Sequence, residues 1–169
     1  MGLIIIISLF LLVPFLIVGL LMVLEAKRKS RIRKHLQKAV NRLSEENGLL
    51  LVNLDYFQDK VIGIDKINKK LVFAHFKRGL VDQLCVDLKS IACCMLSKRI
   101  DQRLKQVTHF FLQLHLNRQR DVLIIDFYDN SRDNRRTQIS LLEKARYWKG
   151  QINLNRRSEK WEAQLEYML

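Results

Sequence analysis

Histidine is the first side chain to consider for chemistry in this sequence, because imidazole binds metals and transfers protons near neutral pH. The chain has His35, His75, His109 and His115. His109 and His115 share one face of a predicted strand, but six residues of strand separate them by about 20 Å, too far to hold one metal ion. His35 lies in a basic helical stretch and His75 in another strand. We therefore expect solvated or hydrogen-bonded histidines, and we predict no metal site and no cofactor.

Residues 129–140 carry oxygen ligands at spacings that partly match a calcium loop. The match fails at the sixth position, which is Asn134 rather than Gly, and at the twelfth, which is Ser140 rather than Glu. We therefore predict a polar turn between a strand and a helix. The sequence also contains no Gly-rich phosphate loop and neither a Gly-x-Ser-x-Gly nor a His-Glu-x-x-His motif.

The three cysteines, Cys85, Cys93 and Cys94, form no Cys-x-x-Cys pair. No base stands at a recognisable spacing from the adjacent Cys93 and Cys94, so we expect structural thiols. An odd number of cysteines without a pairing motif agrees with reduced thiols in a cytoplasmic domain. Nothing in these patterns supports an enzyme, and no small-molecule substrate is identified.

The strongest candidate site is a set of eight basic side chains with no acidic residue among them. Each Lys or Arg near an anionic leaflet contributes about 1 kcal/mol of attraction. We predict that the set binds the membrane surface; the alternative is that it only fixes topology. It holds much of the formal net charge of +13, which favours lipid headgroups over a nucleic-acid surface. The residues are Lys27, Arg28, Lys29, Arg31, Arg33, Lys34, Lys38 and Arg42.

A second basic set, Arg132, Arg135 and Arg136, precedes the predicted C-terminal helix. Its simplest interpretation is an ordinary solvated loop. Basic residues that alternate with exposed aromatic residues on one strand face would indicate a nucleic-acid surface. The strands show no such alternation, so no nucleic-acid partner is expected.

The basic set follows an uncharged run, residues 3–24. As a helix this run is roughly 33 Å long at about 1.5 Å per residue, slightly more than the ~30 Å core of a bilayer, so it predicts a transmembrane helix. Pro14 and Gly19 are tolerated in such helices. A cleaved signal peptide is the alternative, but no basic residue precedes the run and no small-x-small site follows it. The basic exit predicts a single pass through the inner membrane, with the N-terminus outside and the following domain in the cytoplasm.

Residues 25–47 have the apolar spacing of a helix, with a stripe formed by Ile32, Leu36, Ala39, Val40 and Leu43. Asn47-Gly48 is a stop signal. The transmembrane helix and this basic amphipathic helix are expected to form one rod. The stripe needs a partner, which is the following domain, a second copy of the helix or the membrane surface.

After residue 48 the pattern changes to that of strands, at residues 61–65, 71–76, 81–88, 91–96, 107–116 and 122–128. A helix follows. Ser140 and Glu143 fit a capping box, and Leu141, Ala145, Trp148 and Ile152 line one face. We expect about five to seven antiparallel strands closed by this helix, and a short helix at residues 158–169.

Three segments resemble bacterial pleckstrin-homology-like domains. A strand ending in Asp (residues 61–65) is followed by a Lys-Lys-Leu hairpin (residues 69–73) and by a hydrophobic-Asp-Leu-x-x-Ile step (residues 86–91). Residues 125–129 with Leu142, Ala145 and Trp148 resemble the last strand and closing helix of those domains. The resemblance covers roughly residues 50–153. It implies a protein- or lipid-binding module without shared catalytic residues.

These observations predict an α+β protein in four parts. They are a transmembrane helix (3–24), a basic juxtamembrane helix (25–47), a pleckstrin-homology-like sheet or barrel closed by a helix (48–155), and a tail (156–169). The expected function is binding of a protein partner or of an anionic membrane surface by a membrane-anchored cytoplasmic module, with self-association also open. The alternatives are a structural subunit of a membrane-associated complex and a membrane-tethered nucleic-acid-binding protein.

Overall fold

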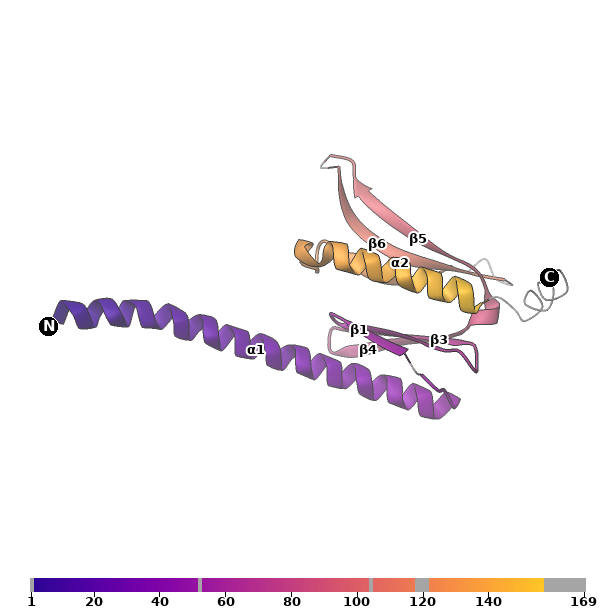
Figure 1. Cartoon of the computed structure of the whole chain (residues 1–169), viewed down its shortest axis with the longest axis horizontal. Coiled ribbons are helices and arrows are strands. Elements are labelled where there is room, and N and C mark those ends of the chain that lie inside the picture. Colours follow the sequence, from indigo (N-terminus) through magenta and orange to yellow (C-terminus); the bar gives the residue numbers. More distant parts are fainter. Residues whose placement is uncertain (1, 52, 104, 118–121, 157–169) are drawn as a thin grey trace, which may run out of the picture.

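The computed structural model describes residues 2–51, 53–103, 105–117 and 122–156, with the side chains of the first helix described from Phe15 onward. These residues form a long N-terminal helix, two antiparallel sheets and a C-terminal helix, so the predicted α+β class is confirmed (Figure 1). The predicted helix at residues 158–169 lies outside the described residues, as does most of the turn between the last two strands.

The first helix, α1, runs without interruption over Gly2–Asn47. It ends as predicted, because Gly48 adopts a φ of 61° and the backbone N–H of Leu49 donates to Ser44 O at 2.8 Å. Its N-terminal half extends away from the sheets (Figure 1). Across the described part of the chain, no helix has an apolar stretch long enough to cross a membrane.

The first sheet is an antiparallel meander of β1 (Asn53–Phe57), β2 (Lys60–Asp65), β3 (Lys70–Lys77) and β4 (Leu80–Asp87). At the β3–β4 turn, Arg78 and Gly79 both have positive φ, 51° and 85°, as a type I′ hairpin requires. The 3-10 helix η1 (Leu88–Ser90) then redirects the chain. The Asp87 carboxylate caps it by accepting from the Lys89 N–H at 2.9 Å.

The second sheet contains β5 (Ile91–Asp101), β6 (Gln106–Leu116) and β7 (Val122–Asp129) in that order. Among the described strands, β4 is not paired with β5 and β1 is not paired with β7, so the sheets stay open and no closed barrel forms. The barrel form of the prediction is therefore wrong. The 3-10 helix η1 carries the chain from β4, at the edge of the first sheet, to β5, at the edge of the second. The helix α2 (Gln138–Asn155) then covers the gap between the two sheets, where a barrel would have further strand pairing.

The main core lies between the two sheets and α2 (Figure 1). The predicted stripe of α2 is confirmed: Leu141, Ala145, Trp148 and Ile152 are buried. Strand β6 contributes its even-numbered apolar residues, as its alternation predicts. Besides the α2 stripe, the fully buried members of this core include Ile62, Leu71, Leu88, Leu112, Leu114, Ile125 and Phe127.

The predicted capping box at Ser140 does not form. The helix begins at Gln138, and the Ser140 hydroxyl donates to Thr137 O at 2.9 Å. Helical backbone starts earlier because the 3-10 helix η2 (Arg135–Thr137) leads directly into α2. Asn134 caps that turn by accepting from the Arg136 N–H at 2.9 Å.

A second core lies on the outer face of the first sheet. The stripe of α1 packs there: Leu36, Val40 and Leu43 are buried in one cluster with residues of β2 and β3. The partner that the stripe requires is therefore the domain itself. The sheet residues in this cluster are Val61, Val72 and Ala74.

Candidate functional site

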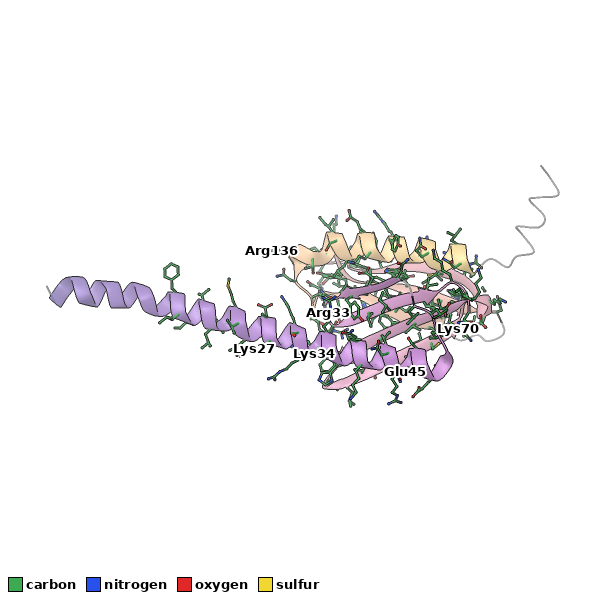
Figure 2. All side chains as sticks on the ribbon, turned by 60° about the horizontal axis from the view of Figure 1, so that its bottom comes forward. Lys27, Arg33, Lys34, Glu45, Lys70 and Arg136 are labelled. Carbon is green, nitrogen blue, oxygen red and sulfur yellow. The ribbon has the colours of Figure 1, made fainter. Side chains whose placement is uncertain are left out.

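The described part of the uncharged run, residues 15–24, is an apolar segment without a cover. Each of its large apolar side chains is exposed, from 51% for Val18 and Val23 to 76% for Phe15. The side chains point outward all round the helix (Figure 2). A helix that is apolar on every side belongs in an apolar environment, so this segment requires one that the described chain does not supply.

All eight basic side chains of the predicted membrane-surface site are exposed on α1. Two form helix ion pairs: Lys29 with Glu25 at 2.9 Å and Arg42 with Glu46 at 2.8 Å. The Arg33 guanidinium lies over the Tyr56 ring, 5.0 Å from its centroid. In the part of the chain that the structure describes, Lys27, Arg28, Arg31, Lys34 and Lys38 have no carboxylate within 4 Å.

The eight residues do not lie at one height. Arg42 is about 22 Å beyond Lys27 along the helix at 1.5 Å per residue. Only residues 27–34 therefore lie close to the end of the uncharged run. Lys38 and Arg42 lie beside the first sheet, on the stretch of α1 whose stripe packs on it.

Contacts between distant segments define which end of the domain faces the apolar segment. The His35 ring stacks on Phe76 of β3 at 5.4 Å, and the Phe76 N–H donates to Asp59 O at 2.8 Å. Gln58, beside Asp59, contacts the Thr137 hydroxyl at 3.5 Å. The β1–β2 turn, the β3–β4 hairpin and the start of α2 thus share one end of the domain, which we call the proximal end.

The second basic set lies at this same proximal end. In Figure 2, Arg136 lies at the end near Arg33, whereas Lys70 and Glu45 lie at the opposite end. Arg135 Nη2 donates to Gln106 Oε1 at 2.6 Å, which brings the β5–β6 hairpin to the proximal end as well. The set is exposed, as expected of a solvated loop. Its position at the same end as residues 27–34 was not predicted, because about a hundred residues separate the two sets and no local pattern links them.

Two proximal carboxylates are neutralised by their own neighbours. Burial would raise the pKa of Asp59, but His75 Nε2 at 3.2 Å and Lys60 Nζ at 3.1 Å lower it to about 2. Burial likewise opposes ionisation of Asp129, and hydrogen bonds from Ser131 together with the Arg132 guanidinium lower its pKa to about 2. These carboxylates therefore do little to offset the exposed lysines and arginines around them.

The four histidines, which were the other candidates for chemistry, do not form a common site among the described residues. His109 Nε2 contacts Asp126 Oδ1 at 2.9 Å and His75 contacts Asp59, so the expectation of hydrogen-bonded histidines is confirmed for this pair of residues. His115 lies opposite Cys93 in the β5–β6 ladder. Within the described ranges, no three His, Cys, Asp or Glu side chains are placed to hold a metal ion.

The loop that partly matches a calcium site satisfies its own hydrogen bonds. The Asp129 carboxylate accepts from the Ser131 N–H at 2.9 Å and from the Ser131 hydroxyl at 2.6 Å. The Asp133 carboxylate accepts from the Asp129 N–H at 2.8 Å. The predicted polar turn between strand and helix is therefore confirmed.

The cysteines are free thiols. Cys94 is buried, and its backbone exchanges two hydrogen bonds with the Asn153 side chain, at 2.9 and 3.2 Å. Burial raises the pKa of the Cys94 thiol to about 12, so it is not a nucleophile at neutral pH. Cys85 and Cys93 are half-buried.

No protein-family model, no curated protein and no solved structure matches this chain. The assignment of a function therefore rests on the geometry above. That geometry combines an uncovered apolar helix with exposed cations, both on the helix and at the proximal end of the domain.

Proposed function

We propose that this chain is a single-span membrane protein that presents a cytoplasmic binding module to the anionic inner face of the membrane. The observation that carries the proposal is the exposed, all-round apolar segment 15–24, followed immediately by the basic residues 27–34. Residues 3–24 lie in the hydrocarbon core, and the basic side chains of residues 27–34 lie in the headgroup layer and just beyond it.

The proximal end supports the same orientation. Because α1 leaves the domain at that end, the β3–β4 hairpin and the loop carrying Arg135 and Arg136 face the bilayer. The first close contact of α1 with the sheet is near Ile32, about 12 Å beyond Leu24 at 1.5 Å per residue. That distance is comparable to the Debye length of about 8 Å at physiological salt plus a headgroup layer, so the nearest residues of the proximal end would lie within electrostatic reach of the membrane.

The module itself is proposed to be a pleckstrin-homology-like domain that binds and does not catalyse. Supporting this proposal is the position of the resembling segments. Residues 61–65 form most of β2, residues 86–91 span the step from β4 through η1 to β5, and Trp148 is buried on the closing helix. We do not propose assembly through the α1 stripe, because the sheet already covers Leu36, Val40 and Leu43.

The first prediction tests the topology of the chain. A reporter that is active only in the cytoplasm should be active when fused after Leu169, and alkaline phosphatase at the same position should be inactive, because the basic exit of the apolar helix stays inside. The protein should also remain in the membrane pellet at alkaline pH. An active phosphatase fusion would contradict the orientation, and release at alkaline pH would contradict the membrane span.

A further inference from the structure

A pocket of about 280 Å³ lies where α1 leaves the domain. Six of its lining residues come from one face of α1, at helical spacings of three and four, and the seventh is Phe76 of β3. Three of the seven are lysine or arginine side chains and three are apolar. The lining residues are Leu24, Lys27, Arg28, Arg31, Ile32, His35 and Phe76.

The pocket exists because the helix is longer than the sheet that it covers. The α1 face that buries Leu36 and Val40 continues toward the N-terminus through Ile32, Arg28 and Leu24, each four residues apart. Near Phe76 the sheet ends, so Arg28 and Leu24 have no strand beneath them. The stacked rings of His35 and Phe76, with centroids 5.4 Å apart, close the end of the pocket nearest the domain.

The charges in the pocket are only weakly compensated, because Arg28 acts on the Glu25 carboxylate at long range and that carboxylate is paired with Lys29. Among the described residues, none of Lys27, Arg28 and Arg31 has a carboxylate within the 4 Å of an ion pair, and their side chains are exposed. An anion placed between them relieves their mutual repulsion. Two guanidinium groups at this spacing favour a phosphate, because each can donate two parallel hydrogen bonds to its oxygens.

The position along the helix identifies the source of the phosphate. Leu24 ends the uncharged run, and Arg28 and Arg31 lie about 6 and 10 Å beyond it at 1.5 Å per residue. The headgroup layer is about 5–7 Å thick on each side of the hydrocarbon core, so Arg28 lies within it. The backbone of Arg31 lies just beyond it, and its long side chain, which leans toward the helix N-terminus, reaches back to the phosphate level. Leu24 and Ile32 provide an apolar wall next to these cations.

We propose that this pocket binds one anionic phospholipid of the cytoplasmic leaflet. Its phosphate lies between Lys27, Arg28 and Arg31, and its glycerol and first acyl carbons lie against Leu24. This inference rests on the membrane span proposed above. It adds to that span a specific lipid site, distinct from the diffuse attraction of the basic segment.

The test is retention of lipid by the purified full-length chain, measured by native mass spectrometry from micelles that contain equal amounts of phosphatidylglycerol and phosphatidylcholine. We expect one retained phosphatidylglycerol, preferred about tenfold or more, because the site recognises net negative charge. Arg28→Gln/Arg31→Gln should reduce that preference to about twofold or less. Arg28→Lys/Arg31→Lys should retain part of it, because the charge stays but the paired hydrogen bonds are lost.

The matched control is Lys34→Gln/Lys38→Gln, which removes the same charge from the same helix outside the pocket and leaves the Arg33–Tyr56 contact in place. It should keep the bound phosphatidylglycerol. Equal loss in both double variants would overturn the proposal in favour of diffuse attraction. Displacement of the lipid by millimolar inorganic phosphate would overturn the lipid as the ligand. Neither result changes the alkaline-extraction outcome, so failure of this site is distinguishable from failure of the membrane span.

Discussion

Asp65 joins three segments at the end of the domain opposite the proximal end. It is fully buried, and its carboxylate accepts hydrogen bonds from the backbone N–H groups of Leu50, Ile67 and Asn68 at 2.7–2.9 Å, and from the Asn68 side chain at 2.7 Å. Burial acts against ionisation, but these donors lower the pKa of the carboxyl below its usual range. The residue therefore fixes the chain as it passes from α1 into the first sheet.

Replacing Asp65 with Asn should destabilise the protein by about 2–4 kcal/mol. Asn offers one acceptor oxygen where Asp offers two, and its NH₂ group would face the Leu50 N–H or the Asn68 amide, leaving buried donors unsatisfied. Urea unfolding of the full-length chain in detergent, followed by far-UV circular dichroism, measures the change. Asp82→Asn, on an exposed position of β4, is the control and should change stability by less than about 0.5 kcal/mol. Equal effects would contradict the role of Asp65.

Acid should destabilise the folded chain through Asp59 and Asp129. Their pKa values in the fold are about 2, against an ordinary value of 3.8, so between these limits the unfolded chain binds more protons. Stability is therefore fully present above about pH 4 and decreases as the pH falls toward 2, by at most about 2 kcal/mol for each carboxyl. Unfolding free energies measured at pH 6, 4, 3 and 2 test this. Asp129→Asn should flatten the profile, and an unchanged slope would exclude its contribution.

At the scale of elements, α2 holds the two sheets together through a few contacts. Trp148 is 2% exposed, and its indole N–H donates to the Asp55 carboxylate at 3.2 Å. Lys144 Nζ contacts the same carboxylate at 2.6 and 2.8 Å. At the other end of the helix, Asn153 binds the Cys94 backbone of β5. The helix is therefore fixed to the first sheet at β1 and to the second at β5.

Trp148→Ala should cost about 3–5 kcal/mol, because it empties part of the core and leaves Asp55 without one donor. That loss is a large part of a typical stability of ~5–15 kcal/mol, so cooperative thermal unfolding should weaken or disappear. Tyr147→Ala is the control, since Tyr147 is adjacent but 53% exposed. Similar small effects of both substitutions would show that α2 does not close the core.

The elements that sequence predicts best are those with a regular pattern over many residues. The alternation along β6 and the stripe of α2 placed Leu112, Leu114 and Trp148 in the core correctly. The predicted start of α2 at Ser140 is wrong. The helical backbone begins earlier because Asn134 caps a 3-10 turn, and no apolar pattern in the sequence marks that turn. The strands form two open sheets because β4 does not pair with β5 and β1 does not pair with β7. The apolar pattern of one strand does not predict which other strand it pairs with.

The candidate site was predictable only in part. The basic run is visible in the sequence, and its exposure follows from its charge. The pocket was not predictable, because it requires Phe76 of β3 to lie against a helix turn that contains His35. A usable signal did exist: β2 and β3 are apolar at consecutive positions, such as Leu71 and Val72, which indicates strands covered on both faces.

For the molecule as a whole, both ends of the domain carry exposed cations, but only the proximal end lies beside the apolar segment. The tip of the β3–β4 hairpin carries Arg78, which is exposed. On the opposite end, the β2–β3 turn carries Lys66, also exposed, and Asn68 binds Gly48 O at 3.1 Å. A membrane that attracts the proximal end should therefore protect Arg78 and leave Lys66 accessible.

Trypsin cleavage of the chain reconstituted in vesicles measures this protection. In vesicles containing phosphatidylglycerol at 50 mM salt, cleavage after Arg78 should be several-fold slower than in phosphatidylcholine vesicles. At 500 mM salt the difference should largely disappear, because the screening length falls to a few Å. Cleavage after Lys66 is the internal control and should not depend on the lipid. Protection of both sites, or of neither, would contradict the proposed orientation.

The continuity of α1 has a mechanical consequence. One helix runs from Gly2 to Asn47, and its C-terminal part is packed against the first sheet. No flexible linker therefore separates the apolar segment from the domain. A helix bends only gently unless it is kinked. When the apolar segment tilts or rotates, the domain therefore tilts or rotates with it. The reverse also holds: a load applied to the domain turns the apolar segment. If that segment spans a membrane as proposed, the chain can carry a force across the boundary between water and lipid.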